Sequence, residues 1–171
     1  GKTEDLDEFD RYYQHLFLWH TEARQVIGGY RLGHAKNIIE QKGYDGLYIC
    51  SLFSLAPKLS EDLNFALEVG RSFVRIEHQR NYSSLMLLWK GIGRYVSLHP
   101  SCRYLLGPVS ISNDYHPLSQ QLIVRFLQGN SMEKERSSLV KPKRPFRVEK
   151  KHSKRVDISI SDLEVVGNLL A

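Results

Sequence analysis

Glu68 is the residue whose type and position most directly suggest a catalytic role. It lies in residues 66–74 (ALEVGRSFV), which alternate as a β-strand does, and its face of the strand otherwise carries only small side chains. That leaves room for a ligand or a water, and burial would raise the pKa of Glu68 toward the range of a general base. The opposite face carries the apolar residues Leu67, Val69 and Phe73. The structural alternative is that Glu68 only pairs with an arginine such as Arg31 or Arg71.

A basic loop follows this strand and leads into a helix predicted from Ser83 to about Val96. The first N–H groups of a helix are free to bind an anion, so Arg80, Ser83 and Ser84 could hold a phosphate or pyrophosphate. The loop contains no glycine. A capped helix start with solvated charges therefore remains the alternative.

Other kinds of site have no support in the sequence. The seven histidines and two cysteines show no metal-binding spacing, so no metal site is expected. No G-x-S-x-G motif or Ser-His-Asp order points to a hydrolase. Two cysteines without a disulfide framework favour a reducing, cytoplasmic setting, and neither a secretory signal nor a stretch of about 20 apolar residues is visible.

Length and charge leave several classes of partner open. The 171 residues fit one domain, and the net charge of +5 with a pI near 9.2 favours an anionic partner. Phosphate-bearing ligands, acidic proteins, anionic lipid and nucleic acid all meet that description. No nucleic-acid reading motif is present, so nucleic acid is the least favoured. The chain begins at Gly1 and stops at Ala171 inside what looks like a helix, so we expect an excised fragment.

The order of predicted elements gives an α/β fold. Strands are predicted at residues 16–19, 25–32, 47–53, 66–74 and 104–111, and helices at 35–42, 83–96, 117–128 and from a capping box at 161–164. We expect a mixed sheet with helices on both faces, in which 66–74 and 104–111 lie side by side and parallel. Pro108 should leave the second of these strands bulged or unpaired. Residues 131–154 are predicted to be a long, mobile connection.

Several segments together resemble a known family. The strongest is ALEVGRSFV at 66–74 followed by HQRNYSSLMLLWKGIGRYV at 78–96. The supporting segments are DEFDRYYQHLFLW at 7–19, GGYRLG at 28–33, LYICSLF at 47–53 and RYLLGPVSIS at 103–112. They resemble bacterial amino-acid N-acyltransferases of ornithine and glycine lipid synthesis, often labelled hemolysin-like. These belong to the GCN5-related acyltransferase superfamily and are close to acyl-homoserine-lactone synthases.

The resemblance implies a fold, a reaction and a set of residues. The fold is a mixed, mostly antiparallel sheet flanked by helices, with a splayed parallel strand pair. An acyltransferase core is expected at 1–130, and a basic linker with the start of a truncated C-terminal segment at 131–171. The reaction moves a (3-hydroxy)fatty acyl group from a thioester to the amino group of an amino acid such as ornithine or glycine. By this resemblance the residues that shape the amine and acyl pocket are Asp7, Asp10, Arg31, Glu68 and Arg71, with Glu68 the candidate base.

Two departures from the family pattern bear on the donor and on activity. Ser83 and Leu85 stand where the superfamily's pyrophosphate loop usually has small glycine-type residues, which favours an acyl carrier protein over coenzyme A as the donor. The family's later apolar segment is absent, so the isolated fragment could be inactive. The alternative is a membrane-associated hemolysin-like protein without acyl transfer. Peripheral membrane contact through the Lys/Arg-rich residues 141–155 fits either function.

Overall fold

The computed structural model describes residues 5–79, 82–130 and 133–146. The chain divides into two compact units, Gly1–Pro108 and Val109–Ala171. The first unit holds the sheet and every residue of the site discussed below. The second holds α5 (Pro117–Asn130), α6 (Lys134–Ser138) and the short strand β6 (Val140–Pro142). The predicted core boundary at residue 130 stays a prediction.

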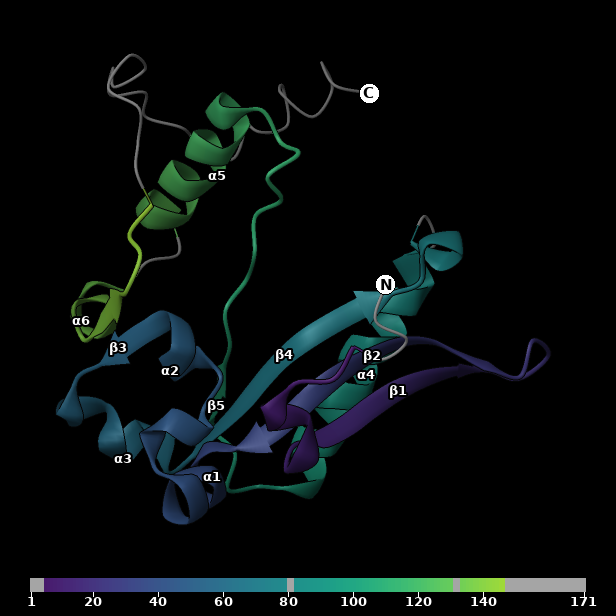
Figure 1. The fold of residues 1–171 in the computed structure, drawn as a ribbon, viewed down its shortest axis with the longest axis horizontal. Coiled ribbons are helices and arrows are strands. Elements are labelled where there is room, and N and C mark those ends of the chain that lie inside the picture. The colour runs from purple at the N-terminus through teal and green to yellow at the C-terminus, as the bar shows by residue number, and fades with distance from the viewer. Residues whose placement is uncertain (1–4, 80–81, 131–132, 147–171) are drawn as a thin grey trace. The chain divides into compact units, whose positions relative to one another are not determined.

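A four-stranded mixed sheet organises the first unit (Figure 1). Its order is β1 (Gln14–His20), β2 (Gln25–His34), β4 (Ala66–Val74) and β5 (Tyr104–Leu106). The first three strands are antiparallel, and β5 is parallel to β4. The parallel pairing ends at Glu68 and Leu106, while β4 continues for six more residues to Val74. The predicted fold class, with its parallel pair, is confirmed.

Helices cover both faces of this sheet. On one face α4 (Tyr82–Leu98) buries Leu88 and Ile92, and Ile92 packs with Leu32 and Leu67 in the core. On the other face α1 (Ala35–Lys42) lies at one end, where a Cβ at Gly33 would meet Ile38. We call the face turned away from α4, which carries Phe17, Gly29, Arg31 and Phe73, the open face.

The remaining elements of the first unit are short. They are the 3-10 helices η1 (Glu8–Arg11), η2 (Tyr44–Gly46), η3 (Pro57–Leu59) and η4 (Ile76–His78), the helices α2 (Ile49–Leu52) and α3 (Ser60–Leu63), and the strand β3 (Phe53–Leu55).

The strand predicted at 47–53 is wrong. The segment is mostly the helical turn α2, with only Phe53 in a strand. The first turn of a helix leaves backbone N–H groups without internal partners. Here the N–H groups of Tyr48 and Ile49 donate to the carboxylate of Glu68, which holds the turn in place.

Two smaller predictions also need correction. The strand predicted at 104–111 ends at Leu106, and Pro108 lies outside it, as a residue without an N–H donor should. The segment 131–154 is not a plain connection, since it contains α6 and β6 within its described part. The helix predicted from the capping box at 161–164 lies outside the described residues.

Candidate functional site

Glu68 is buried near the start of β4, with 1% of its surface exposed. Its carboxylate accepts hydrogen bonds from the Ile49 N–H at 2.6 Å, from the Tyr48 N–H at 3.2 Å and from the Tyr13 hydroxyl. Burial raises the pKa of Glu68, and these donors oppose that rise by stabilising the carboxylate. Glu68 therefore has structural partners, but they are not the arginines that the sequence suggested. Among the described residues, Glu68 is held by a phenol and two amides and not by an arginine ion pair.

Tyr13 was not predicted as part of the site, and it connects Glu68 to the charged residues. Burial, with Glu68 nearby, raises the pKa of Tyr13, so the phenol stays protonated and donates. The guanidinium carbon of Arg31 lies 5.0 Å from the centre of the Tyr13 ring. The sequence shows Tyr13 only as one of two adjacent tyrosines before a strand, and this gives no signal for its role.

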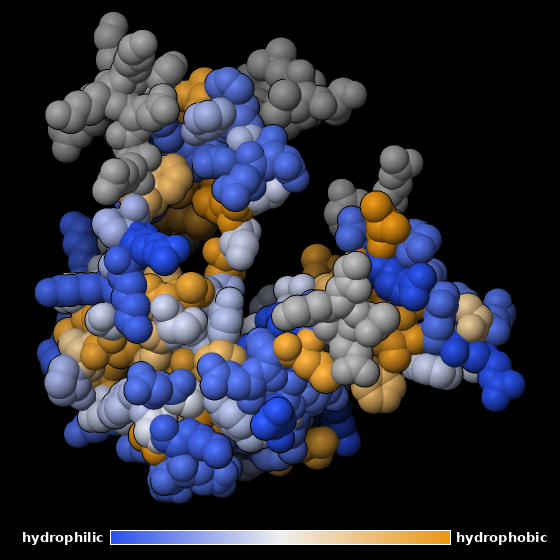
Figure 2. Space-filling view, in the orientation of Figure 1, coloured by the Kyte–Doolittle hydropathy of each residue, from blue (hydrophilic) through white to orange (hydrophobic). Residues whose placement is uncertain are grey.

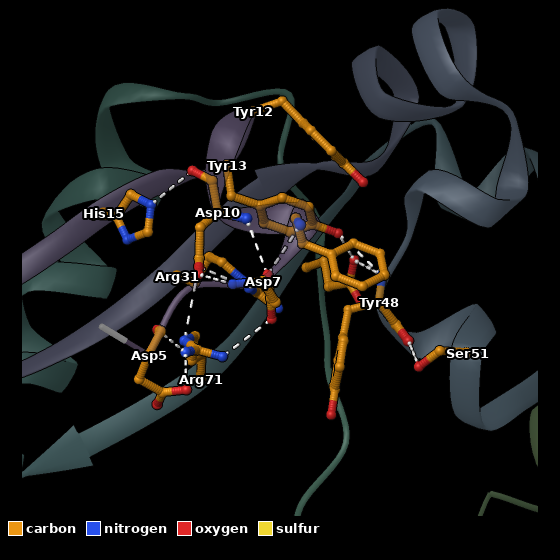
Figure 3. A network of polar contacts seen from close by, with 12 residues as sticks. Asp5, Asp7, Asp10, Tyr12, Tyr13, His15, Arg31, Tyr48, Ser51 and Arg71 are labelled. Atoms are coloured by element: carbon orange, nitrogen blue, oxygen red, sulfur yellow. Dashed lines mark hydrogen bonds and ion pairs between the residues drawn. The ribbon is translucent and has the colours of Figure 1, made fainter. Parts of the chain in front are cut away.

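Arg31 lies at the centre of a buried ion-pair cluster (Figure 3). Only 2% of its side chain is exposed, and its Nη1 contacts Asp7 at 2.6 Å and Asp10 at 2.8 Å. Its guanidinium also packs on the rings of Phe9, Tyr13 and Tyr48. Aromatic faces and two carboxylates leave this guanidinium little room for a substrate.

The acidic segment folds locally to present both carboxylates to Arg31. Asp7 and Asp10 form a capping box around η1, in which each side chain accepts from the other residue's backbone N–H. Burial opposes ionisation of Asp10. The Asp7 N–H and the Arg31 guanidinium outweigh that effect and lower the pKa of Asp10. The predicted residues Asp7, Asp10 and Arg31 are thus brought together.

Arg71 joins the same cluster from a β-bulge in β4. Gly70 pairs with Arg31 and Phe73 pairs with Gly29, so Arg71 and Ser72 together lie opposite one residue of β2. Arg71 has φ of 46°, in the left-handed region that side chains rarely adopt. Its guanidinium contacts Asp5 at 3.0 Å and Asp7 at 3.1 Å, and 31% of its side chain is exposed. Arg71 is therefore the accessible arginine of the cluster.

The bulge also corrects the predicted faces of β4. Phe73 does not share a face with Leu67 and Val69, because the extra residue reverses the alternation after Gly70. A Cβ built on Gly29 would lie 3.0 Å from the Phe73 ring, which places that ring on the open face. The sequence gives no signal for this, because Arg71 is not a residue that favours positive φ.

A hollow of about 590 Å³ lies on the open face beside the cluster. Asp5, Arg31 and Arg71 line it together with the apolar side chains of Phe17, Val26 and Phe73. Figure 2 shows apolar surface alternating with polar surface over this part of the molecule. Glu68 and Tyr13 do not line the hollow.

The predicted anion-binding residues lie elsewhere. Arg80 is outside the described residues. Ser83 is exposed and Ser84 buried in the first turn of α4, and both line a smaller hollow with residues of the β1–β2 hairpin. The role predicted for these residues stays a prediction.

A second polar network lines a hollow of about 700 Å³ at the C-terminal end of α4. It was not predicted from the sequence. His34 Nε2 lies 2.8 Å from the Tyr95 hydroxyl, and the Cys102 sulfur lies 3.5 Å from His34 Nδ1.

Within the described ranges, no group of three or more His, Cys, Asp or Glu side chains is placed to hold a metal ion. Nor does that part of the chain contain a helix long and apolar enough to cross a membrane.

The basic segment 141–155 is only partly described. Lys141, Lys143 and Arg144 are exposed, and the residues from 147 onward lie outside the described part. Membrane contact through this segment stays a prediction.

Comparison with known proteins gives a family and two relatives. Residues 1–90, just over half of the chain, match the family described as acetyltransferase (GNAT) domain. The chain is 29% identical over 160 residues to a glycine N(alpha)-acyltransferase of Phocaeicola vulgatus, covering 87% of this chain and 48% of that protein. A protein of the same name from Bacteroides thetaiotaomicron gives 29% over 160 residues, with 87% and 47% covered. The chain thus spans about half the length of these relatives. No solved structure matches it.

Proposed function

The chain belongs to the GNAT acetyltransferase domain family, and on this basis we propose that it transfers an acyl group from a thioester donor to the amino group of an amino acid. Glycine is the first candidate, since both relatives are named for it. The observation that carries the proposal is the partly exposed guanidinium of Arg71, held by acidic residues beside a hollow on the open face.

The acceptor would bind at the exposed end of the charged cluster. Arg31 is buried and pairs with two carboxylates, whereas Arg71 is partly exposed and pairs with the fully exposed side chain of Asp5. A substrate carboxylate could displace Asp5 and form the two parallel hydrogen bonds that guanidinium groups favour. Asp7, which is partly exposed, would attract the ammonium group.

The donor would bind along the free edge of β4. Within the described residues, positions 69–74 of β4 have no ladder partner on the β5 side. The backbone groups that point away from β2, other than the Val74 carbonyl that accepts from Gln79 Nε2, are therefore available to the amides of a pantetheine arm, as in strand addition. Amide N–H groups there would also polarise the thioester carbonyl. Acyl carrier protein and acyl-coenzyme A both carry this arm, and the residues at positions 83 and 85 favour the carrier protein.

An acidic carrier protein would find positive charge on α4 and just before β5. Lys90, Arg94 and Arg103 are exposed, and Arg80 precedes α4 in the sequence. Charge of this kind speeds and orients association with an acidic partner. Membrane aminolipid synthesis, as in ornithine or glycine lipid formation, is the pathway class that such a carrier would serve.

Glu68 remains our proposed proton acceptor, acting as a base through Tyr13. The amine must lose a proton to attack the thioester, and burial raises the pKa of Glu68 toward the useful range. Because neither Glu68 nor Tyr13 lines the hollow, a water would carry the proton to the Tyr13 oxygen as the Tyr13 hydroxyl gives its own proton to Glu68. Tyr13→Phe tests this route, since it keeps the ring and removes the hydroxyl. An unchanged rate would rule the route out.

The acceptor site is tested by comparing glycine with glycinamide, which lacks the carboxylate. We expect acyl transfer to favour glycine, and we expect Arg71→Met to remove that preference by raising KM for glycine alone. A bidentate charged contact of this kind is worth about 1.5–3 kcal/mol, or about 10- to 100-fold in KM. If the glycine-to-glycinamide ratio is the same in both proteins, Arg71 does not bind the acceptor.

No observation favours the hemolysin-like alternative.

A further inference from the structure

A cysteine and a histidine meet in a hollow that takes no part in the proposed acyl transfer. The Cys102 sulfur lies 3.5 Å from Nδ1 of His34, and both side chains are half-buried. His34 ends β2, and Cys102 lies between α4 and β5, where its N–H donates to the His99 carbonyl oxygen at 2.9 Å. Both side chains line the hollow of about 700 Å³ at the C-terminal end of α4. Among the residues that the structure describes, none lines both this hollow and the one on the open face.

A chain of hydrogen bonds fixes which nitrogen of His34 faces the thiol. The Tyr95 hydroxyl donates to the side-chain oxygen of Gln14. The Tyr95 oxygen lies 2.8 Å from His34 Nε2 and is left to accept, so Nε2 carries the proton. In a neutral imidazole the other nitrogen is an acceptor, and Nδ1 accordingly accepts from the Cys102 thiol.

The imidazole and the thiol are both uncharged near pH 7. Burial, and then the neighbouring His99, lowers the pKa of His34, and burial raises the pKa of Cys102. The other titratable groups beside His34 in the hollow are Tyr95, whose pKa burial raises, and Lys36. A thiol must lose its proton to attack, and a neutral imidazole in contact with it can take that proton. A nucleophile, a base and a third group that orients the base form the arrangement typical of an activated cysteine.

The charges around the hollow favour a negatively charged ligand. Lys36 lines it with 56% of its side chain exposed, and its nearest carboxylate oxygen, on Glu40, lies 4.0 Å away. The guanidinium carbon of Arg103 lies 4.8 Å from the centre of the Phe65 ring, which also lines the hollow. No Asp or Glu is among the described residues that line it. Its volume falls within the range of about 300–1,000 Å³ that is usual for small-molecule sites.

We propose that Cys102 is a thiol–disulfide exchange site for a small, negatively charged disulfide that binds in this hollow. The Cys102 sulfur attacks one sulfur of the ligand, and a mixed disulfide forms as the S–S bond of the ligand breaks. His34 Nδ1 takes the thiol proton and gives it to the departing thiolate. The Cys102 sulfur is oxidised and the departing sulfur is reduced, so the ligand is the only oxidant that the step needs. The inference goes beyond the proposed function and does not depend on it, since the two hollows share no described lining residue.

The test follows the mixed disulfide at Cys102 by peptide mass spectrometry, in the full-length protein at pH 7 and pH 8. The probes are glutathione disulfide, which is anionic, and cystamine, which is cationic. With glutathione disulfide, Cys102 should react about 10²-fold faster in the folded protein than in urea, the lower end of the usual scale for general base catalysis. The folded rate should be nearly equal at the two pH values, because His34 is already unprotonated at both. A thiol without a base would react about tenfold faster at pH 8, since its thiolate fraction rises tenfold.

Two variants separate activation of the thiol from simple burial. His34→Gln should slow the folded reaction about 10²-fold and produce the tenfold rise between pH 7 and pH 8. Tyr95→Phe keeps the ring, removes the hydroxyl that orients His34, and should change rate and pH dependence in the same direction; it also serves if His34→Gln does not fold. Tyr44→Phe, which removes a hydroxyl from an exposed tyrosine outside the hollow, is the matched control.

A third variant tests the charge of the ligand. Lys36→Gln should lower the preference for glutathione disulfide over cystamine about two- to fivefold, the scale of one exposed charge pair. Lys58→Gln, at an exposed lysine that does not line the hollow, should leave the preference unchanged. Coenzyme A disulfide in the same assay separates two kinds of anion, because faster reaction with it would assign the charge to phosphates and slower reaction to carboxylates.

Three results would overturn the inference. Slower reaction of Cys102 in the folded protein than in urea would make it a buried thiol only. A wild-type rate that rises tenfold between pH 7 and pH 8, as in His34→Gln, would show that the imidazole does not act as a base. Equal rates with glutathione disulfide and cystamine would show that the hollow does not select a negatively charged ligand.

Discussion

Replacement of Arg31 by methionine should destabilise the fold far more than the same change at Arg71. The Arg31 side chain is 2% exposed, and its partners Asp7 and Asp10 are 29% and 7% exposed. Removing one partner of a buried ion pair leaves an uncompensated charge and costs about 3–5 kcal/mol. The ion pairs of Arg71 are more exposed, and pairs of that kind contribute about 0.2–1 kcal/mol each.

Urea denaturation of the wild type and both variants measures the difference. With an m-value of about 2 kcal/mol per molar urea, a loss of 4 kcal/mol lowers the unfolding midpoint by about 2 M. The loss from Arg71→Met should lower it by about 1 M or less. Adding Asp10→Asn to Arg31→Met should recover part of the loss, because it removes a buried carboxylate that would keep only a 3.7 Å contact with Arg71.

Equal midpoints for Arg31→Met and Arg71→Met would refute the reasoning. Equal midpoints would mean that the two arginines do not differ in burial. The assignment of Arg71 as the accessible arginine would then have no basis. A double variant that is no more stable than Arg31→Met would show that the charge left on Asp10 is not what destabilises that variant.

Three further predictions follow from the same contacts. Glu68→Gln should slow acyl transfer about 10²–10⁴-fold in a steady-state assay, the usual scale for loss of a general base; a normal rate would make Glu68 purely structural. The lowered pKa of Asp10 means that its ionised form stabilises the fold above its ordinary pKa, and that this contribution is lost as pH falls through the lowered value. Acid unfolding of Asp10→Asn should therefore depend less on pH than that of the wild type, and parallel curves would contradict this. Arg71→Gly should be about 1 kcal/mol more stable than Arg71→Ala, because both lose the guanidinium but only glycine relieves the positive φ; equal thermal midpoints would argue against strain at the bulge.

The sequence predicts elements whose signals are local. The strand 66–74 and the helix 35–42 appear with the predicted bounds, since alternation defines the first and Gly43 ends the second. The mixed sheet with its parallel pair was expected from the order of the predicted elements and from the family resemblance, and it is confirmed.

Features that depend on distant contacts could not be predicted. Residues 47–53 are apolar in a way that suits a buried strand or a buried helix equally, and the hydrogen bonds from Tyr48 and Ile49 to Glu68 favour the helical turn. The position of Phe73 depends on a bulge at Arg71 that has no glycine signature. Register and faces after a bulge cannot be read from alternation alone.

The charged residues of the site were predicted as a set, but their separate roles were not. Asp7, Asp10, Arg31 and Arg71 do come together. The two arginines differ because the rings of Phe9, Tyr13 and Tyr48 enclose only Arg31. Nothing in the sequence around those rings indicates which arginine they contact.

The central claim is N-acyl transfer to an amino acid, and mass spectrometry of the reaction product tests it most directly. The protein, at the full length that its gene encodes, is incubated with a dodecanoyl thioester of acyl carrier protein or coenzyme A and with ¹⁵N-labelled glycine. The account predicts labelled N-dodecanoylglycine together with an equal amount of released thiol, and a lower yield with Arg71→Met at limiting glycine. Thiol release without any labelled N-acyl product would contradict it, since the protein would then be hydrolysing the thioester and not transferring its acyl group.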